Sequence, residues 1–180
     1  MKRQIRSSVF ETNSSSTHSI AISKAPVVIG KSIHFGIGEF GWENDTANTA
    51  DYLYTAILEQ DDRLDLLDKL KEILDKYSIE YQFEEPIWNR YSDSNYTWLA
   101  YGYIDHSNEA RELIFALLDN EDLLMRYLFG DSTVYTGNDN QDCCPDGCNI
   151  ADEYCWDWDG KEYLNPYHDT ENYEYFYKGN

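Results

Sequence analysis

Basic side chains are scarce in this 180-residue chain, in which 14 Lys and Arg stand against 34 Asp and Glu for a formal net charge of -20. The imbalance is uneven. Residues 1–35 contain five basic residues and one acid, whereas residues 131–180 contain twelve acids and two lysines. A surface of this sign repels a phosphate backbone and attracts basic proteins. We therefore expect the acidic body of the protein not to bind nucleic acid.

Long apolar runs are also missing. No stretch approaches the roughly 18 apolar residues of a membrane span. The basic start "MKRQIRSSVF" is followed by polar residues, where an export signal needs an apolar stretch of roughly 7 to 15. We expect a cytoplasmic protein without membrane contact. In that compartment the four cysteines are thiols or metal ligands rather than disulfides.

Aromatic residues are abundant, with 16 Tyr, 7 Phe and 5 Trp against 2 Met. The apolar fraction of 42% is sufficient for a hydrophobic core in a chain of this length. Residues 1–180 are therefore predicted to form a single α+β domain.

The hydrophobic periodicity changes along the chain and predicts the order of elements. Spacings of three and four predict helices within 49–78 and 108–130, which makes two helical blocks. We expect a mixed or antiparallel sheet, with an acidic, loop-rich segment at 141–172. Short runs that alternate or are rich in apolar residues predict strands at 4–11, 18–23, within 26–40, at 79–88, within 131–140 before a Gly-Asn-Asp turn, and at 171–180. Residues 95–105 are apolar on both faces and predict a central strand.

The polar segment "ETNSSSTHS" (11–19) contains the residue types of an acid-His-Ser arrangement in Glu11, His18 and Ser16. In an extended chain Ser16 and His18 lie about 7 Å apart at the backbone, whereas a nucleophile must lie within about 3 Å of its base. An anion-binding turn that holds a phosphate near the N-terminal basic residues is a second interpretation. A polar turn between two strands is a third, and it explains most of these residues.

The four cysteines lie within 13 residues, at Cys143, Cys144, Cys148 and Cys155. Thiolates gathered so closely can form a tetrahedral zinc site. The spacing departs from a paired C-x-x-C pattern, and partly buried free thiols are the alternative.

Acids and aromatics alternate in "DEYCWDWDGKEY" (152–163). The calcium loop that such a run suggests fails in register, because its first acid and its final glutamate are missing. In a protein interface, aromatics anchor the contact and carboxylates engage Arg and Lys of the partner. A solvated acidic face is the alternative. The residues predicted to bind a partner are Asp152, Glu153, Trp156, Asp157, Trp158 and Asp159.

The N-terminal "VFETNSSSTHSI", the internal "TGNDN" and the terminal "YFYKGN" together resemble accessory proteins, without an assigned activity, of phages and mobile elements of Gram-positive bacteria. A small, very acidic protein of this origin is also similar in kind to anti-CRISPR and DNA-mimic inhibitors. The acidic charge outside the N-terminal region, the interleaved Trp and Tyr from Tyr154 to Tyr177 and the lack of a persuasive catalytic set predict an inhibitor. It would occupy the basic surface of a host nucleic-acid-binding defence protein, such as a CRISPR nuclease, and the similarity in kind favours this hypothesis. An enzyme or anion-binding domain that uses the Thr12 to Ser19 loop, and a zinc-stapled structural module, remain as alternatives.

Metal analysis of the purified protein tests the zinc hypothesis. A four-thiolate site is expected to carry about one equivalent of zinc, and replacing one ligand in Cys148→Ser is expected to lower that content. Less than about half an equivalent in the unmodified protein would exclude a structural zinc site.

Overall fold

The computed structural model describes residues 16–41, 45–90, 97–104, 110–138, 153–156, 159–166 and 168–178. The strand predicted at 4–11 lies outside these residues.

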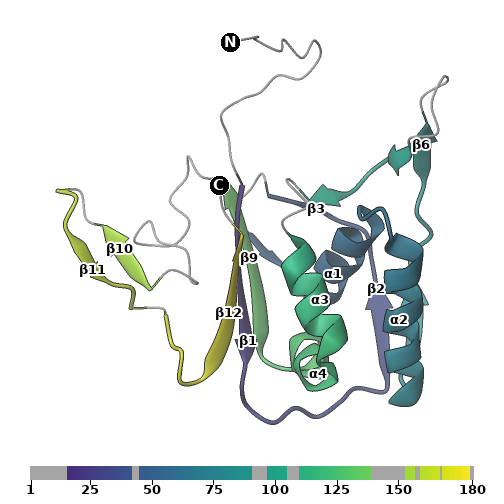
Figure 1. Cartoon of the computed structure of the whole chain (residues 1–180), viewed down its shortest axis with the longest axis horizontal. Helices are drawn as coiled ribbons and strands as arrows, with labels where there is room; N and C mark the ends of the chain where they lie inside the picture. Colours follow the sequence, from purple (N-terminus) through teal and green to yellow (C-terminus); the bar gives the residue numbers. More distant parts are fainter. Residues whose placement is uncertain are drawn as a thin grey trace.

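An antiparallel sheet of four strands in the order β12-β1-β9-β4 organises the fold (Figure 1). Its strands are β1 (Ser16–Ser23), β4 (Asp45–Ala47), β9 (Ser132–Asn138) and β12 (Tyr173–Lys178). Ile20 of β1 lies opposite Val134 on one side and Phe176 on the other. The strands predicted at 18–23 and at the C-terminal end are thus confirmed as β1 and β12, and β1 lies between β12 and β9 in the sheet.

Three helices cover one face of this sheet: α1 (Thr49–Leu58), α3 (Arg111–Asp119) and α4 (Glu121–Phe129) (Figure 1). Helix α2 (Arg63–Lys76) packs farther out, against α1 and α3. Every residue from Tyr52 to Leu58 is buried, because α1 lies between the sheet and the outer elements. None of the helices in the described ranges is long and apolar enough to cross a membrane.

The two helical blocks predicted from the periodicity are confirmed. In α2 the buried residues are Leu66, Leu70, Ile73 and Leu74, which recur at spacings of three and four as a single apolar stripe requires. Asn120 separates the helices of the second block, and its side-chain Oδ1 accepts a hydrogen bond from the backbone N–H of Leu123 at 3.2 Å. This cap allows α4 to begin directly after α3 in a new direction.

Within the described residues, four two-stranded pairs complete the fold. Two are parallel and two are antiparallel, so the α+β fold class is confirmed with both kinds of pairing. The parallel pairs are β2 (Ser32–Phe35) with β5 (Glu80–Phe83), and β3 (Glu39–Phe40) with β8 (Tyr103–Ile104); the antiparallel pairs are β6 (Trp88–Arg90) with β7 (Thr97–Leu99), and β10 (Tyr154–Trp156) with β11 (Glu162–Leu164).

The prediction of one central strand over 95–105 is wrong. This region contains the short strands β7 and β8, each in a different two-stranded pair. Gly102 separates them with a φ of +76°, which a non-glycine residue rarely adopts. An apolar run does not reveal such a turn, because the turn depends on one backbone angle.

Two predicted turns are shorter than expected. The polar run is expected to connect two strands and to end at Thr17, but β1 already begins at Ser16. The turn expected from Gly137 starts later, because β9 continues through Gly137 and Asn138. Thr17 lies opposite Gly137 in the register, so cross-strand pairing overrides the turn preference of both segments.

Three side chains, two from α1 and one from the end of β5, hold the chain between β2 and β3. The backbone N–H groups of residues 36, 37 and 38 donate in turn to Asp51 Oδ1 at 2.6 Å, Glu84 Oε2 at 2.9 Å and Thr55 Oγ1 at 3.1 Å. The hydrogen bond from Ile37, followed by that from the Tyr101 hydroxyl, lowers the pKa of the Glu84 carboxyl. The segment is therefore fixed to α1 and to the end of β5.

Replacing Gly102 tests how tightly this region is packed. A Cβ at Gly102 would lie 2.2 Å from Ile37 Cγ2, in addition to the strain of the positive φ. Gly102→Ala is expected to lower the free energy of unfolding by about 2–5 kcal/mol. Gly160→Ala is the matched control, because Gly160 has a φ of +74° with nothing within 4 Å of its added Cβ; it should cost about 1–2 kcal/mol. Equal losses in chemical denaturation would contradict close packing at Gly102.

Candidate functional site

His18, the predicted acid-base candidate, lies in the core. Its side chain is 0% exposed, and its Nδ1 lies 2.6 Å from the Tyr52 hydroxyl oxygen. The two rings are also in edge-to-face contact, with centroids 5.5 Å apart. Burial, together with the nearby Glu59, raises the pKa of Tyr52 far above its ordinary value, so the phenol stays neutral. This geometry suits a core contact between sheet and helix rather than proton exchange with an external substrate.

The described residues do not show Glu11 or Ser16 in contact with the His18 side chain. Glu11 lies outside them, and Ser16 is described at the backbone only, opposite Asn138. The fully buried partner of His18 is instead Tyr52, which lies near the fully buried Tyr127. Burial, followed by the nearby Tyr52, raises the pKa of the Tyr127 hydroxyl well above its ordinary value. No catalytic arrangement follows from this cluster.

The zinc hypothesis falls largely on undescribed residues. Cys143, Cys144 and Cys148 lie outside the described ranges. Cys155 belongs to β10, opposite Tyr163, and its side chain is not described. Within the described part of the chain, no group of three or more His, Cys, Asp or Glu side chains could hold a metal ion. The zinc site therefore stays a prediction.

The predicted partner-binding residues lie in and around the β10–β11 pair. Glu153 precedes β10, Trp156 ends it, and Asp159 lies in the turn before β11. Glu153 and Asp159 are exposed, whereas Trp156 is described at the backbone only. Asp152, Asp157 and Trp158 lie outside the described residues.

The β10–β11 pair also exposes two apolar side chains that sequence reasoning missed. Tyr154 and Leu164 lie directly opposite each other in the register and are 40% and 66% exposed. The exposed Glu153 and Glu162 flank them, and the backbone N–H of Asn165 extends the pair by donating to the Glu153 carbonyl at 2.9 Å. Figure 1 shows this pair on the side of the central sheet away from the helices. An apolar centre with a carboxylate rim is typical of a contact with a basic surface.

One sequence signal could have found this pair. Asp159-Gly160 is a common hairpin turn, and Gly160 has a positive φ as such turns require. Taken as a turn, it places the residues before and after it on opposite strands. A two-residue turn would place Tyr154 opposite Asn165, one residue from the observed register, so this signal predicts the hairpin but not the exact Tyr154–Leu164 pairing.

Most of the basic side chains of the helices are used inside the molecule. Lys69 of α2 pairs with Asp119 at the end of α3, and Lys76 pairs with Glu121 at the start of α4, with Nζ–Oε2 at 2.6 Å. Arg126 of α4 donates to Glu174 of β12 at 2.9 Å and also binds Asp122. These cations connect elements to one another. Each of these cations therefore neutralises an acid next to it and is not available to pair with the other carboxylates of the surface.

Helix α2 carries a row of exposed carboxylates. Its acids recur at spacings of three and four, which places them on one solvent-facing side. All of them are exposed, and Lys71 approaches one at 3.4 Å. The row consists of Asp65, Asp68, Glu72 and Asp75. The same helix carries four basic residues, so its formal charges balance and the row is a local feature of its surface.

No family model matches the chain, and comparisons with curated proteins and with solved structures gave no match.

Replacing His18 tests its role in the core. His18→Ala would leave a cavity and remove the partner of the buried Tyr52 hydroxyl. We expect it to lower the free energy of unfolding by about 2–4 kcal/mol. The matched control is His34→Ala, because His34 is exposed on β2; it should change stability by less than about 0.5 kcal/mol. A stable His18→Ala protein, measured by thermal or urea unfolding, would contradict a structural role for this histidine.

Proposed function

We propose that this chain is an acidic binding protein of phage or mobile-element origin. It inhibits a host defence protein by occupying the basic surface that normally holds nucleic acid. A CRISPR nuclease is the most concrete candidate for that partner, because its guide-target duplex lies in a positively charged channel.

The observation that carries this proposal is the exposed pair Tyr154–Leu164 with carboxylates on its rim. Apolar side chains at the centre of an interface supply most of the binding free energy when they are desolvated. Carboxylates around them accelerate association with a basic partner and select against acidic ones. The β10–β11 pair combines both features on one small surface.

The distribution of charge supports the same proposal. The chain carries a formal charge of -20, and many of its helical cations are bound to acids of the same molecule. Such a protein repels DNA and RNA and competes with them for a shared basic site. Inhibition by competition is therefore more consistent with the surface than direct binding of nucleic acid.

A cleavage assay with a guide-loaded CRISPR nuclease tests the proposal. The protein is expected to slow DNA cleavage at about 50 mM salt and to lose potency as salt rises to about 200 mM, since opposite charges are screened. The double variant Tyr154→Ser, Leu164→Ser is expected to weaken inhibition about 10- to 100-fold, because it removes the apolar centre.

Val28→Ser is the matched control, since Val28 is 92% exposed and lies outside the β10–β11 pair. It should leave inhibition within about twofold of the unmodified protein. The proposed function would be refuted if the protein bound neither the nuclease nor other basic nucleic-acid-binding proteins at low salt. Equal inhibition by the double variant would refute the site.

A further inference from the structure

The β2–β5 pair has an outer edge that no described strand covers. It is a two-stranded parallel sheet, and the described residues place no other strand beside β2. A free strand edge presents unpaired N–H and C=O groups, which are suited to bind another extended segment.

The hydrogen bonds with β5 identify the backbone groups on that edge. Glu80 N–H donates to the Lys31 carbonyl and Glu84 N–H donates to the Phe35 carbonyl, each at 2.9 Å. In a parallel ladder, alternate residues of a strand face the same neighbour. Residues 31, 33 and 35 of this strand therefore face β5, and the backbone groups of Ser32 and His34 point to the outer edge.

The outer edge is open over a short length. At its C-terminal end the Gly36 N–H is already bound by Asp51 Oδ1 at 2.6 Å. The described residues place no hydrogen-bond partner on the N–H or C=O of Ser32 or His34. Two donors and two acceptors are thus available to a third strand.

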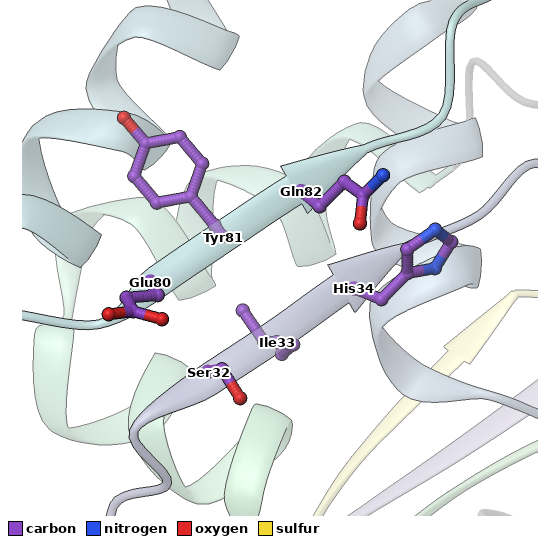
Figure 2. A pocket seen from close by; sticks show the side chains of 6 residues that line it. All are labelled: Ser32, Ile33, His34, Glu80, Tyr81 and Gln82. Carbon is purple, nitrogen blue, oxygen red and sulfur yellow. The ribbon is translucent and has the colours of Figure 1, made fainter.

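The open face of the pair forms a shallow hollow of about 350 Å³ (Figure 2). Ile33 and Tyr81 pack against the core on the other face, whereas the four polar side chains of the pair are exposed. Ser32 lies directly opposite Glu80, and His34 lies opposite Gln82. Because the Ser32 side chain is small, a long side chain from beyond the outer edge of β2 can pass over Ser32 and reach the Glu80 carboxylate.

We propose that an extended segment of a basic partner protein adds to β2 as a third strand, and that a Lys or Arg of this segment reaches across Ser32 to Glu80. A residue of the added strand beside Ser32 would have its Cα about 9.6 Å from that of Glu80, which is twice the spacing between strands. A Lys or Arg side chain and the Glu80 side chain together span this distance. Main-chain hydrogen bonds supply the binding, and the cation supplies the selectivity.

Charge decides the kind of occupant. A second copy of this chain could also pair through β2, but each copy would bring a formal charge of -20 to the contact. A segment rich in Lys or Arg is attracted by the same charge. The site lies on elements other than β10 and β11, so the proposal does not rest on the function proposed above.

The experiment uses the full chain and an acetylated eight-residue peptide that alternates Arg and Val. With the peptide at about ten times its Kd, the backbone amides of Ser32 and His34 are expected to exchange with solvent about tenfold more slowly, because exchange then proceeds from the small free fraction. The amides of Ile33 and Phe35, which face β5, serve as the internal control and should change little. Unchanged exchange at Ser32 and His34 in the presence of bound peptide would overturn the proposal.

Two matched variants separate the Glu80 contact from general charge attraction. Glu80→Gln is expected to weaken peptide binding about 5- to 10-fold. Glu72→Gln removes one exposed acid from α2 and should leave binding within about twofold. Equal effects of the two variants would overturn the role of Glu80. The Tyr154→Ser, Leu164→Ser variant should bind the peptide normally, which keeps this result separate from the outcome of the cleavage assay.

Discussion

The contact between His18 and Tyr52 fixes how the central sheet meets the helices. Both residues are fully buried, and the hydrogen bond at 2.6 Å joins the middle strand β1 to the buried helix α1. In a strand, a shift of one residue moves every side chain to the opposite face. Such a shift would place Ser19 in the position of His18 and leave the Tyr52 hydroxyl buried without its partner, which costs more than the hydrogen bond itself contributes. The polar contact thus specifies the register that buries Ile20 and Ile22.

A second set of constraints fixes the outer elements relative to this core. The consecutive N–H groups of residues 36–38 are bound by side chains from α1 and from the end of β5. Tyr103 N–H also donates to the Gly38 carbonyl at 2.9 Å, which brings β8 to the same segment. Short strands have little stability alone. The β2–β5 and β3–β8 pairs are therefore held in place by these side-chain contacts more than by their own ladders.

The parts of the fold that depend on local pattern could be predicted from the sequence. Helix α2 shows its apolar stripe in Leu66, Leu70 and Ile73, because one helix face determines that spacing. The break at Gly102 depends on close approach to Ile37, and the pairing of Tyr154 with Leu164 depends on a turn between them. Likewise, the sequence placed His18 beside Ser16 but gave no sign of Tyr52, which is 34 residues away. The surroundings of the candidate site residues depend on contacts between residues far apart in the chain, and local periodicity does not predict such contacts.

The two proposed binding surfaces differ in the physical origin of the affinity that each proposal assigns to them. The β10–β11 pair offers exposed apolar side chains, whose burial depends on the shape of the partner and little on salt. The β2 edge offers backbone groups, which any extended segment can pair with. Glu153 and Glu162 lie beside the first surface and Glu80 beside the second, in a chain with a formal net charge of -20. In both proposals, charge selects basic partners at long range, and the apolar pair or the strand edge determines which of them remain bound.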